Sequence, residues 1–350
     1  MPGPITFYQL LRHLGSARAA LETLPDLAHR GGRAAPLRVF PRAASEAEIA
    51  RTAALGARLV TLGDPEYPKL LAAVDDAPPL LSLKGHAHLG NRETFAIVGA
   101  RNASAAGVRL TRMLASELGR EGLVIVSGLA RGIDGAAHEG ALASGTIAVL
   151  AGGIDVVYSL EHQALYGKIA ESGLLIAKIP TGTEPKAHHF PRDNRIISGS
   201  SLGVLVVEAA ARSGSLITTR FALEQGREVL AMPGSPLDPR ARGANDLIRQ
   251  GAALVESADD ILRTLRSLPR PLAEPASGGP APAPDLAAIA AARRVIQDKL
   301  SVTPVVIDEL VRQSGFGPAV VQTVVLELEL AGLAERRPGN LVAALPNSDI

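Results

Sequence analysis

Six strongly apolar runs recur between residues 95 and 231, separated by segments with helical periodicity. After the first run, for example, Leu110, Leu114 and Leu118 recur every four residues, as on one face of a helix. Strands that are apolar on both faces and alternate with helices are typical of a parallel sheet covered on both sides. The sequence therefore predicts an α/β fold with an extended, mostly parallel sheet. The six runs are FAIVG (95–99), LVIVS (123–127), TIAVL (146–150), GLLIA (173–177), GVLVV (203–207) and REVLA (227–231).

Composition changes along the chain predict where the domains end. Residues 267–284 contain six prolines and two glycines with no hydrophobic period, which indicates a linker at 267–285. Residues 1–80 show short helical patterns, which predict a small helical domain before the sheet domain at 81–266. Residues 286–350 show three helical patterns and then a hairpin signal at Pro338-Gly339-Asn340, which predict a winged helix.

The residue types present exclude several classes of protein. The 350 residues include no cysteine, which excludes disulfides, thiolate metal sites and a cysteine nucleophile. The start of the chain does not have the form of a signal peptide, and no apolar run reaches the ~18 residues of a membrane span. We therefore expect a cytoplasmic protein that does not enter the membrane. No carboxylate or histidine cluster has the spacing of a metal site, so we expect no metal.

Glycines, small hydroxyl residues and arginines follow the predicted strands. Because the carboxyl ends of parallel strands meet at one edge of a sheet, these residues are expected to line a single crevice. Backbone N–H groups at helix starts, together with arginines, suit an anion, so the sequence predicts a ligand that carries phosphate. The residues predicted to form phosphate-binding loops are Gly99, Ser127, Gly128, Arg131, Gly132, Ser213, Gly214 and Ser215.

The motifs narrow the class of phosphate-bearing ligand that the crevice can bind. The first strand is followed by GARNAS where a dinucleotide site needs G-x-G-x-x-G, and G-x-x-x-x-G-K-[ST] of NTPases does not occur. Arginines spread over several loops fit the phosphates of a nucleic-acid backbone, and the ring of Phe190 can stack on one base. Gly199 to Gly203 match G-x-S-x-G, but the strand follows the serine where a nucleophile elbow needs it before, so we predict no catalytic residue.

Five motifs in order, together with GANDLIRQGA (243–252), show that the chain resembles the DNA-processing protein A (Smf) family over most of its length. The resemblance implies an extended Rossmann-like domain between a small helical domain and a winged helix. The N-terminal helices, with LRHLGS at 11–16, are interpreted as a unit like a sterile alpha motif or a helix-hairpin-helix. The resemblance also implies a homodimer that binds and protects single-stranded DNA, loads the RecA recombinase in transformation or recombination, and has no enzymatic activity or cofactor. The motifs are IVGAR (97–101), IVSGLARGIDGAAHEGAL (125–142), FPRDNRIIS (190–198), VVEAAARSGSLIT (206–217) and MPGSP (232–236).

The resemblance also assigns residues to the DNA. It implies that Arg101 grips a phosphate and that Lys186 and Phe190 contact backbone and base. The Arg-Asn-Arg of the family reads Asp193-Asn194-Arg195 here, which replaces one positive charge by a negative one. The predicted DNA-binding residues are Arg101, Lys186, Phe190, Arg192, Asn194 and Arg195.

Other interpretations stay open at this point. The glycines can be plain turns, Asn194 and Arg195 can tie the loop to neighbouring groups, and Phe190 can be a core residue. A nucleotide-binding hydrolase of the phosphoribohydrolase type would place glycines at the same edge. A duplex-binding regulator would use the winged helix, but its third helical pattern, GPAVVQTVVLELELAG (317–332), carries no cation, which favours a protein contact or a stabilising role.

Overall fold

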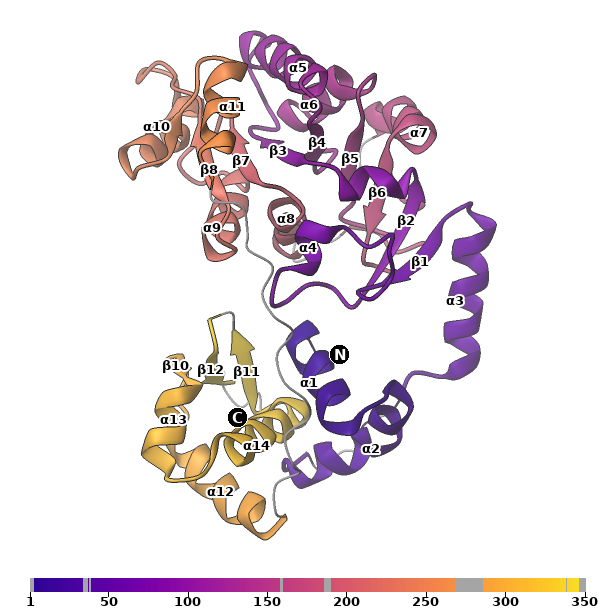
Figure 1. Ribbon diagram of the computed structural model, residues 1–350, viewed down its shortest axis with the longest axis vertical. Coiled ribbons are helices and arrows are strands. Elements are labelled where there is room, and N and C mark those ends of the chain that lie inside the picture. Colours follow the sequence, from indigo (N-terminus) through magenta and orange to yellow (C-terminus); the bar gives the residue numbers. More distant parts are fainter. Residues whose placement is uncertain are drawn as a thin grey trace. The chain divides into compact units, whose positions relative to one another are not determined.

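The computed structural model describes residues 3–33, 37, 39–157, 160–185, 190–268, 286–337 and 339–345. Contacts divide the chain into two compact units, one made of Ala43–Pro271 and the other of Met1–Arg42 together with Leu272–Ile350. Most of the helices and strands of both are labelled in Figure 1.

The unit at 43–271 is built on a mixed sheet that has nine strands in the part of the chain that the structure describes, in the order β1-β2-β6-β5-β4-β3-β7-β8-β9. The pairs β1–β2 and β2–β6 are antiparallel and the others are parallel, which confirms the mostly parallel α/β fold. The six predicted runs are β3 to β8, each within one residue of its predicted ends. The strands are β1 (Arg58–Thr61), β2 (Leu80–Gly85), β3 (Thr94–Val98), β4 (Val124–Ser127), β5 (Thr146–Val149), β6 (Leu174–Ala177), β7 (Gly203–Val206), β8 (Glu228–Ala231) and β9 (Ala253–Leu254).

Helices cover both faces of this sheet. Alternate residues of a strand point to opposite faces, so each strand contributes side chains to two cores. In β3, Phe95 and Ile97 join the core under α5, α6 and α11, whereas Ala96 and Val98 join the core under α4, α8, α9 and α10. Helix α7 lies on the same face as α6. The helices are α3 (Arg42–Ala54), α4 (Lys69–Ala72), α5 (Ala105–Arg120), α6 (Ile133–Ala141), α7 (Gln163–Ser172), α8 (Phe190–Gly199), α9 (Ser215–Glu224), α10 (Arg242–Arg249) and α11 (Ala258–Arg266), with 3-10 turns at Ala87–Asn91, Leu160–His162 and Pro239–Ala241.

The first domain boundary differs from the prediction. The sequence placed it at residue 80, with helices before it, but the sheet already begins with β1 and the contacts divide the chain near residue 42. Only Val60 of the four residues of β1 is buried, because β1 is an antiparallel edge strand. Such a short, half-exposed strand does not have the continuous apolar run that identifies the central strands.

The second unit contains the predicted winged helix. Three helices are followed by a hairpin of β11 and β12, and β10 pairs with β12 on its other side. Val305 and Val306 form β10, and the second of the three helices begins at Ile307. The elements of this unit are α1 (Pro4–Leu14), α2 (Ala17–Arg30), α12 (Leu286–Lys299), β10 (Val305–Val306), α13 (Ile307–Ser314), α14 (Pro318–Ala331), β11 (Ala334–Arg337) and β12 (Leu341–Ala344).

The two N-terminal helices pack directly on the winged helix. Leu10 of α1 and Leu24 and Leu27 of α2 form one buried cluster with Leu326 and Leu330 of α14. The opposite side of α14 packs on α12, α13 and the hairpin. Segments from the two ends of the chain therefore share one compact unit.

Candidate nucleic-acid interface

The loops after β4, β3 and β7 lie side by side, because these three strands are neighbours in the parallel part of the sheet. We call the three loops, residues 99–104, 128–132 and 207–215, the rim. Each contributes one exposed arginine, namely Arg101, Arg131 and Arg212. Exposed guanidinium groups on adjacent loops suit a ligand with several phosphates.

Glycines hold the loops after β3 and β4 against each other. A Cβ on Gly132 would lie 2.3 Å from the carbonyl oxygen of Ala100 and 2.7 Å from that of Arg101, and its φ is +76°. A Cβ on Gly99 would lie 2.7 Å from the side chain of Ile133. These two predicted phosphate-loop glycines thus permit a close backbone approach, which fixes the position of the loop that carries Arg101.

Two groups predicted to bind phosphate are directed into the protein. The hydroxyl of Ser127 is fully buried and donates to the carbonyl of Ile97 at 2.6 Å. The N–H of Gly128 donates to the carboxylate of Asp134 at 3.2 Å, as does that of Ala130 at 3.4 Å. Burial raises the pKa of Asp134 to about 6. As placed, Ser127 and Gly128 shape the loop and offer no free donor to a ligand, in contrast to the prediction.

A carboxylate also fills the N-terminus of α5. Glu208, just after β7, accepts the N–H of Ser104 at 2.9 Å and its hydroxyl at 2.5 Å. A Cβ on Gly107 would lie 2.7 Å from a carboxylate oxygen of Glu208. In dinucleotide-binding sheets the pyrophosphate sits at this helix terminus. Here the negative charge of Glu208 takes that place, which agrees with the missing glycine fingerprint.

The loop after β7 stays open to solvent. Gly214 is exposed, and a Cβ there would meet no atom within 4 Å. The hydroxyls of Ser213 and Ser215 lie 2.7 Å apart, and Ser215 begins α9. The side-chain amide of Asn194 donates to the carbonyl of Gly214 at 3.3 Å. Asn194 therefore ties α8 to the rim, and the hydroxyls remain within reach of a ligand.

Arg195 is held by carboxylates and does not extend from the rim. Its guanidinium contacts Asp76 at 2.6 Å and Glu224 at 2.9 Å, and it lies over the ring of Phe221 with 4.5 Å to the centroid. Glu224 ends α9, whose other end begins at the rim. The guanidinium thus lies at the end of α9 that is farther from the rim, and this geometry favours the structural alternative for Arg195 over a DNA contact.

The unusual acid in the motif does not face a ligand either. The side chain of Asp193 is 5% exposed and its carboxylate lies 3.3 Å from the ammonium of Lys178 at the end of β6. Because the charge is buried and paired, it adds little negative potential to the rim. Asp193 therefore does not place its negative charge on the rim.

Three of the predicted DNA contacts belong to the sequence 186–192, which includes the first turn of α8. Lys186 lies outside the described residues. Phe190 begins α8 and Arg192 lies in its first turn, which is all that the structure describes of them. Their roles stay predictions.

Arg101 and Arg131 also line a cavity of about 500 Å³ next to the rim. Several polar or charged residues of this cavity were not found from the sequence, because they lie between the motifs, on helix surfaces or in a 3-10 turn. The signal was weak, since a cation on an exposed helix face is ordinary. The missed residues are Arg112, His162 and Lys168.

The winged helix does not present its third helix to DNA. Glu327 of α14 is fully buried and pairs with Arg293 at 2.5 Å and with Arg30 at 3.7 Å. Arg336 of the hairpin is 5% exposed and lies 3.4 Å from Glu329. A helix that reads a groove needs a free polar face, and α1 and α2 cover this one.

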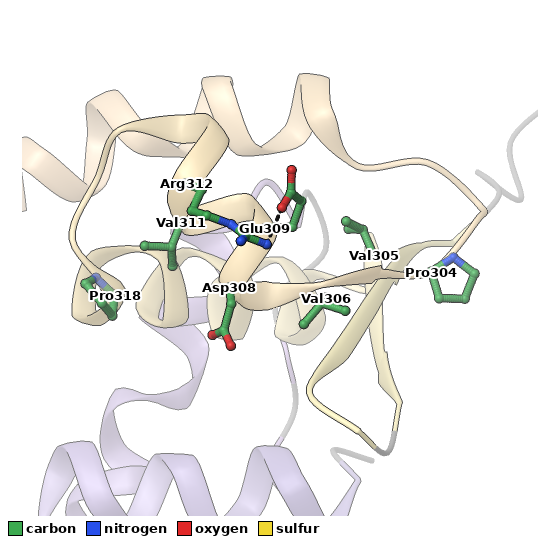
Figure 2. A pocket seen from close by; sticks show the side chains of 8 residues that line it. All are labelled: Pro304, Val305, Val306, Asp308, Glu309, Val311, Arg312 and Pro318. Carbon is green, nitrogen blue, oxygen red and sulfur yellow. Dashed lines mark ion pairs between the residues drawn. The ribbon is translucent and has the colours of Figure 1, made fainter.

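A second concavity has a volume of about 720 Å³. It lies beside α13 and β10 of the winged helix (Figure 2). Its lining is mostly apolar, and the one cation, Arg312, points toward Glu309, with which it pairs. Two carboxylates and an internally paired arginine do not suit a polyanion. The lining residues are Pro304, Val305, Val306, Asp308, Glu309, Val311, Arg312 and Pro318.

Three family models match the chain in the order of its domains. The description DNA recombination-mediator protein A matches residues 58–266, and DprA winged helix domain matches residues 280–340. DprA-like N-terminal HHH domain matches residues 2–51. The first match covers the whole sheet and more than half of the chain.

Similar proteins include Protein Smf of Escherichia coli, which is 39% identical over 307 residues, 87% of this chain and 82% of that protein. Among solved structures, DNA processing protein A of Streptococcus pneumoniae has a TM-score of 0.66 at 36% identity, covering 74% of this chain and 92% of that one. The protein of the same name from Helicobacter pylori, whose structure concerns its mode of binding single-stranded DNA, has a TM-score of 0.54 at 28% identity. That likeness covers 59% of this chain and 95% of the Helicobacter chain.

Among the described residues, no helix combines the length and the apolar character that crossing a membrane requires.

Proposed function

Because this chain belongs to the DNA recombination-mediator protein A family, we propose that it binds single-stranded DNA along the rim. The observation that carries the proposal is the placement of Arg101, Arg131 and Arg212 on three adjacent loops, each exposed to solvent. Arg101 is the best supported of the three, since Gly132 fixes its loop. The Helicobacter relative, whose structure is described by its single-stranded DNA binding, supports the choice of ligand.

The first turn of α8 adds the contacts that the family motif implies. We retain Phe190 as the residue that stacks on a base, and Lys186 and Arg192 as phosphate contacts. Stacking of one base contributes ~1–3 kcal/mol and does not depend on sequence. The predicted binding is thus tolerant of base sequence and dominated by the phosphates.

We also propose that the protein acts in DNA processing without an enzymatic step, as a homodimer that protects the strand and passes it to the RecA recombinase. The relatives are named as DNA processing proteins, which supports the general role. Sedimentation equilibrium tests the dimer. Recombinase ATP hydrolysis on DNA coated with single-strand binding protein tests the transfer, since the lag before hydrolysis should shorten.

The two rival functions have less support. A dinucleotide-like site at α5 is filled by Glu208, which argues against nucleotide turnover there. A duplex reader needs α14, which packs against α1 and α2. We therefore expect single strands to bind more tightly than duplexes of the same length.

The direct test is Arg101→Ala, measured by fluorescence anisotropy with oligothymidine at several salt concentrations. Loss of one phosphate contact should weaken binding about tenfold, ~1.4 kcal/mol. It should also reduce the slope of log K against log salt by ~0.7, the value for one phosphate of a single strand.

Arg120→Ala is the matched control, because Arg120 is exposed at the far end of α5 and does not line the rim. It should bind like the unchanged protein. If Arg101→Ala also binds with unchanged affinity and salt slope, the rim is not the DNA site.

A further inference from the structure

A charged groove adjoins the rim and is lined mainly by residues of α5, α6 and α7. Its volume is about 500 Å³, within the ~300–1,000 Å³ range of ligand sites. Arg101 and Arg131 belong to both the rim and the groove, so the groove adjoins the rim at these two residues. The groove is lined by Arg101, Val108, Arg112, Arg131, Gly132, Gly135, Ala136, Glu139, Leu142, Glu161, His162, Ala164, Leu165 and Lys168.

Positive charge exceeds negative charge along this groove. Four cations, Arg101, Arg112, Arg131 and Lys168, face two carboxylates, Glu139 and Glu161. Arg112 is paired with Glu139. The excess positive charge is therefore carried by the remaining groups.

Those remaining cations are accessible. Arg131 lies 3.7 Å from Glu161, and both side chains are more than half exposed, so the pair is weak and can exchange for a phosphate. Lys168 is exposed on α7, and among the described residues no carboxylate lies within 4 Å of its ammonium. Both cations can therefore bind an anion without the loss of a strong ion pair.

His162 supplies an unused polar atom in the same groove. Its Nε2 is buried and has no hydrogen-bond partner among the described residues, and the nearest recorded carboxylate oxygen, from Glu161, is 3.9 Å away. The ring packs on the first turn of α6, where a Cβ on Gly135 would lie 2.5 Å from Cε1. Gly135 thus makes room for an imidazole whose free nitrogen can bond a ligand in the groove.

We propose that this groove is a second phosphate subsite, which holds the backbone of the same single strand next to the segment on the rim. The proposal rests on the proposed function. Arg131 and Lys168 contact phosphate oxygens, His162 adds a hydrogen bond, and Arg101 joins the two segments. The bound strand is therefore longer than the rim alone can hold.

The test uses Lys168→Ala in the full chain, because Arg131 also belongs to the rim, and Arg120→Ala is the control. Lys168→Ala should weaken binding of a 20-nucleotide oligothymidine about three- to tenfold and lower the salt slope by ~0.7. If Arg101→Ala weakens binding but Lys168→Ala behaves like Arg120→Ala, the groove proposal is wrong and the proposed function stands. If Arg101→Ala is also silent, the proposed function itself fails.

A second readout does not depend on affinity. The chain has no cysteine, so Lys168→Cys and Arg120→Cys each create a single thiol. Oligothymidine with a thiol-reactive group on its backbone should crosslink to position 168 and not to position 120. Equal labelling of both positions would contradict the proposal. A second contradicting result is that Lys168→Ala weakens the binding of thymidine monophosphate but leaves the affinity for oligothymidine unchanged. The groove would then be a site for a small molecule.

Discussion

At the scale of single residues, the partners of an arginine decide whether it can reach DNA. Arg101 and Arg195 both stand in motifs and look equivalent in the sequence. Arg101 is exposed on a loop, whereas Arg195 is held between Asp76 and Glu224. Both carboxylates come from segments distant in sequence, so spacing around Arg195 could not reveal them.

The ion pairs predict a mainly structural effect for Arg195→Ala. The change leaves Asp76 and Glu224 without their cation, and should lower the free energy of unfolding by ~2 kcal/mol. This is less than the ~3–5 kcal/mol of a fully buried pair, because the side chain of Arg195 is 20% exposed. Urea unfolding measures the loss, and DNA affinity at a temperature where the variant is folded should stay within about twofold. Adding Asp76→Asn should recover part of the stability, and a tenfold loss of DNA affinity would instead restore Arg195 as a contact.

Asp134 predicts a pH dependence of stability. Its pKa is raised from 3.8 to about 6 in the folded protein, so between these values the folded state holds a proton that the unfolded state has lost. The contribution of Asp134 to the free energy of unfolding is therefore full below pH 4. It decreases as the pH rises to 6, by up to ~1.4 kcal/mol per pH unit. Asp134→Asn should lack this decrease. The difference in unfolding free energy between the two proteins, measured from pH 4 to 7, should follow this curve, and a flat difference would contradict it.

At the scale of elements, apolar continuity decided what the sequence could predict. Strands β3 to β8 are apolar on both faces, so their positions followed directly. Strands β1 and β2 form an antiparallel edge, and β1 has one buried residue, so neither gave a continuous signal. β9 has only two residues. Edge strands are defined by what they pair with, which the sequence does not contain.

Helix α14 did carry a signal of its environment. Its apolar residues extend around the helix, as expected for one that packs on both sides. One side belongs to the winged helix and the other to α1 and α2. The identity of the second partner could not be predicted, because it lies at the opposite end of the chain.

Gly31, which follows α2, tests this contact. Its φ of −69° suits any residue, but a Cβ there would lie 2.1 Å from the carbonyl oxygen of Glu327. Gly31→Ala should thus force α2 and α14 apart, with a loss of ~1–3 kcal/mol as in other overpacked sites. Hydrogen exchange should show faster exchange in α14. Gly3→Ala is the control, since a Cβ on Gly3 meets nothing within 4 Å, and equal exchange in both variants would mean that the contact is loose.

At the scale of the whole molecule, the sequence predicted at which edge of the sheet the site lies, but not how far the site extends. The motifs identified Arg101 and the rim because they lie at strand ends, where the topology brings loops together. Lys168 and His162 come from a segment without a motif, and only the packing of α7 beside α6 brings them to Arg101. The inward direction of Ser127 and Gly128 depends on their acceptors, the carbonyl of Ile97 and the carboxylate of Asp134, which only the three-dimensional structure places beside them.

The division into two units leads to a prediction about where DNA binds. The rim and the groove both lie within residues 43–271, which have their own buried cores. In the other unit, Arg30, Arg293 and Arg336 are engaged by Glu327 and Glu329. A fragment of residues 43–271 should therefore fold and bind oligothymidine with an affinity and salt slope within about twofold of the full chain. Circular dichroism establishes folding and anisotropy measures binding. A folded fragment that binds more than tenfold more weakly would show that the winged-helix unit supplies part of the DNA site, because a separate unit without contacts to the strand cannot change its affinity that far.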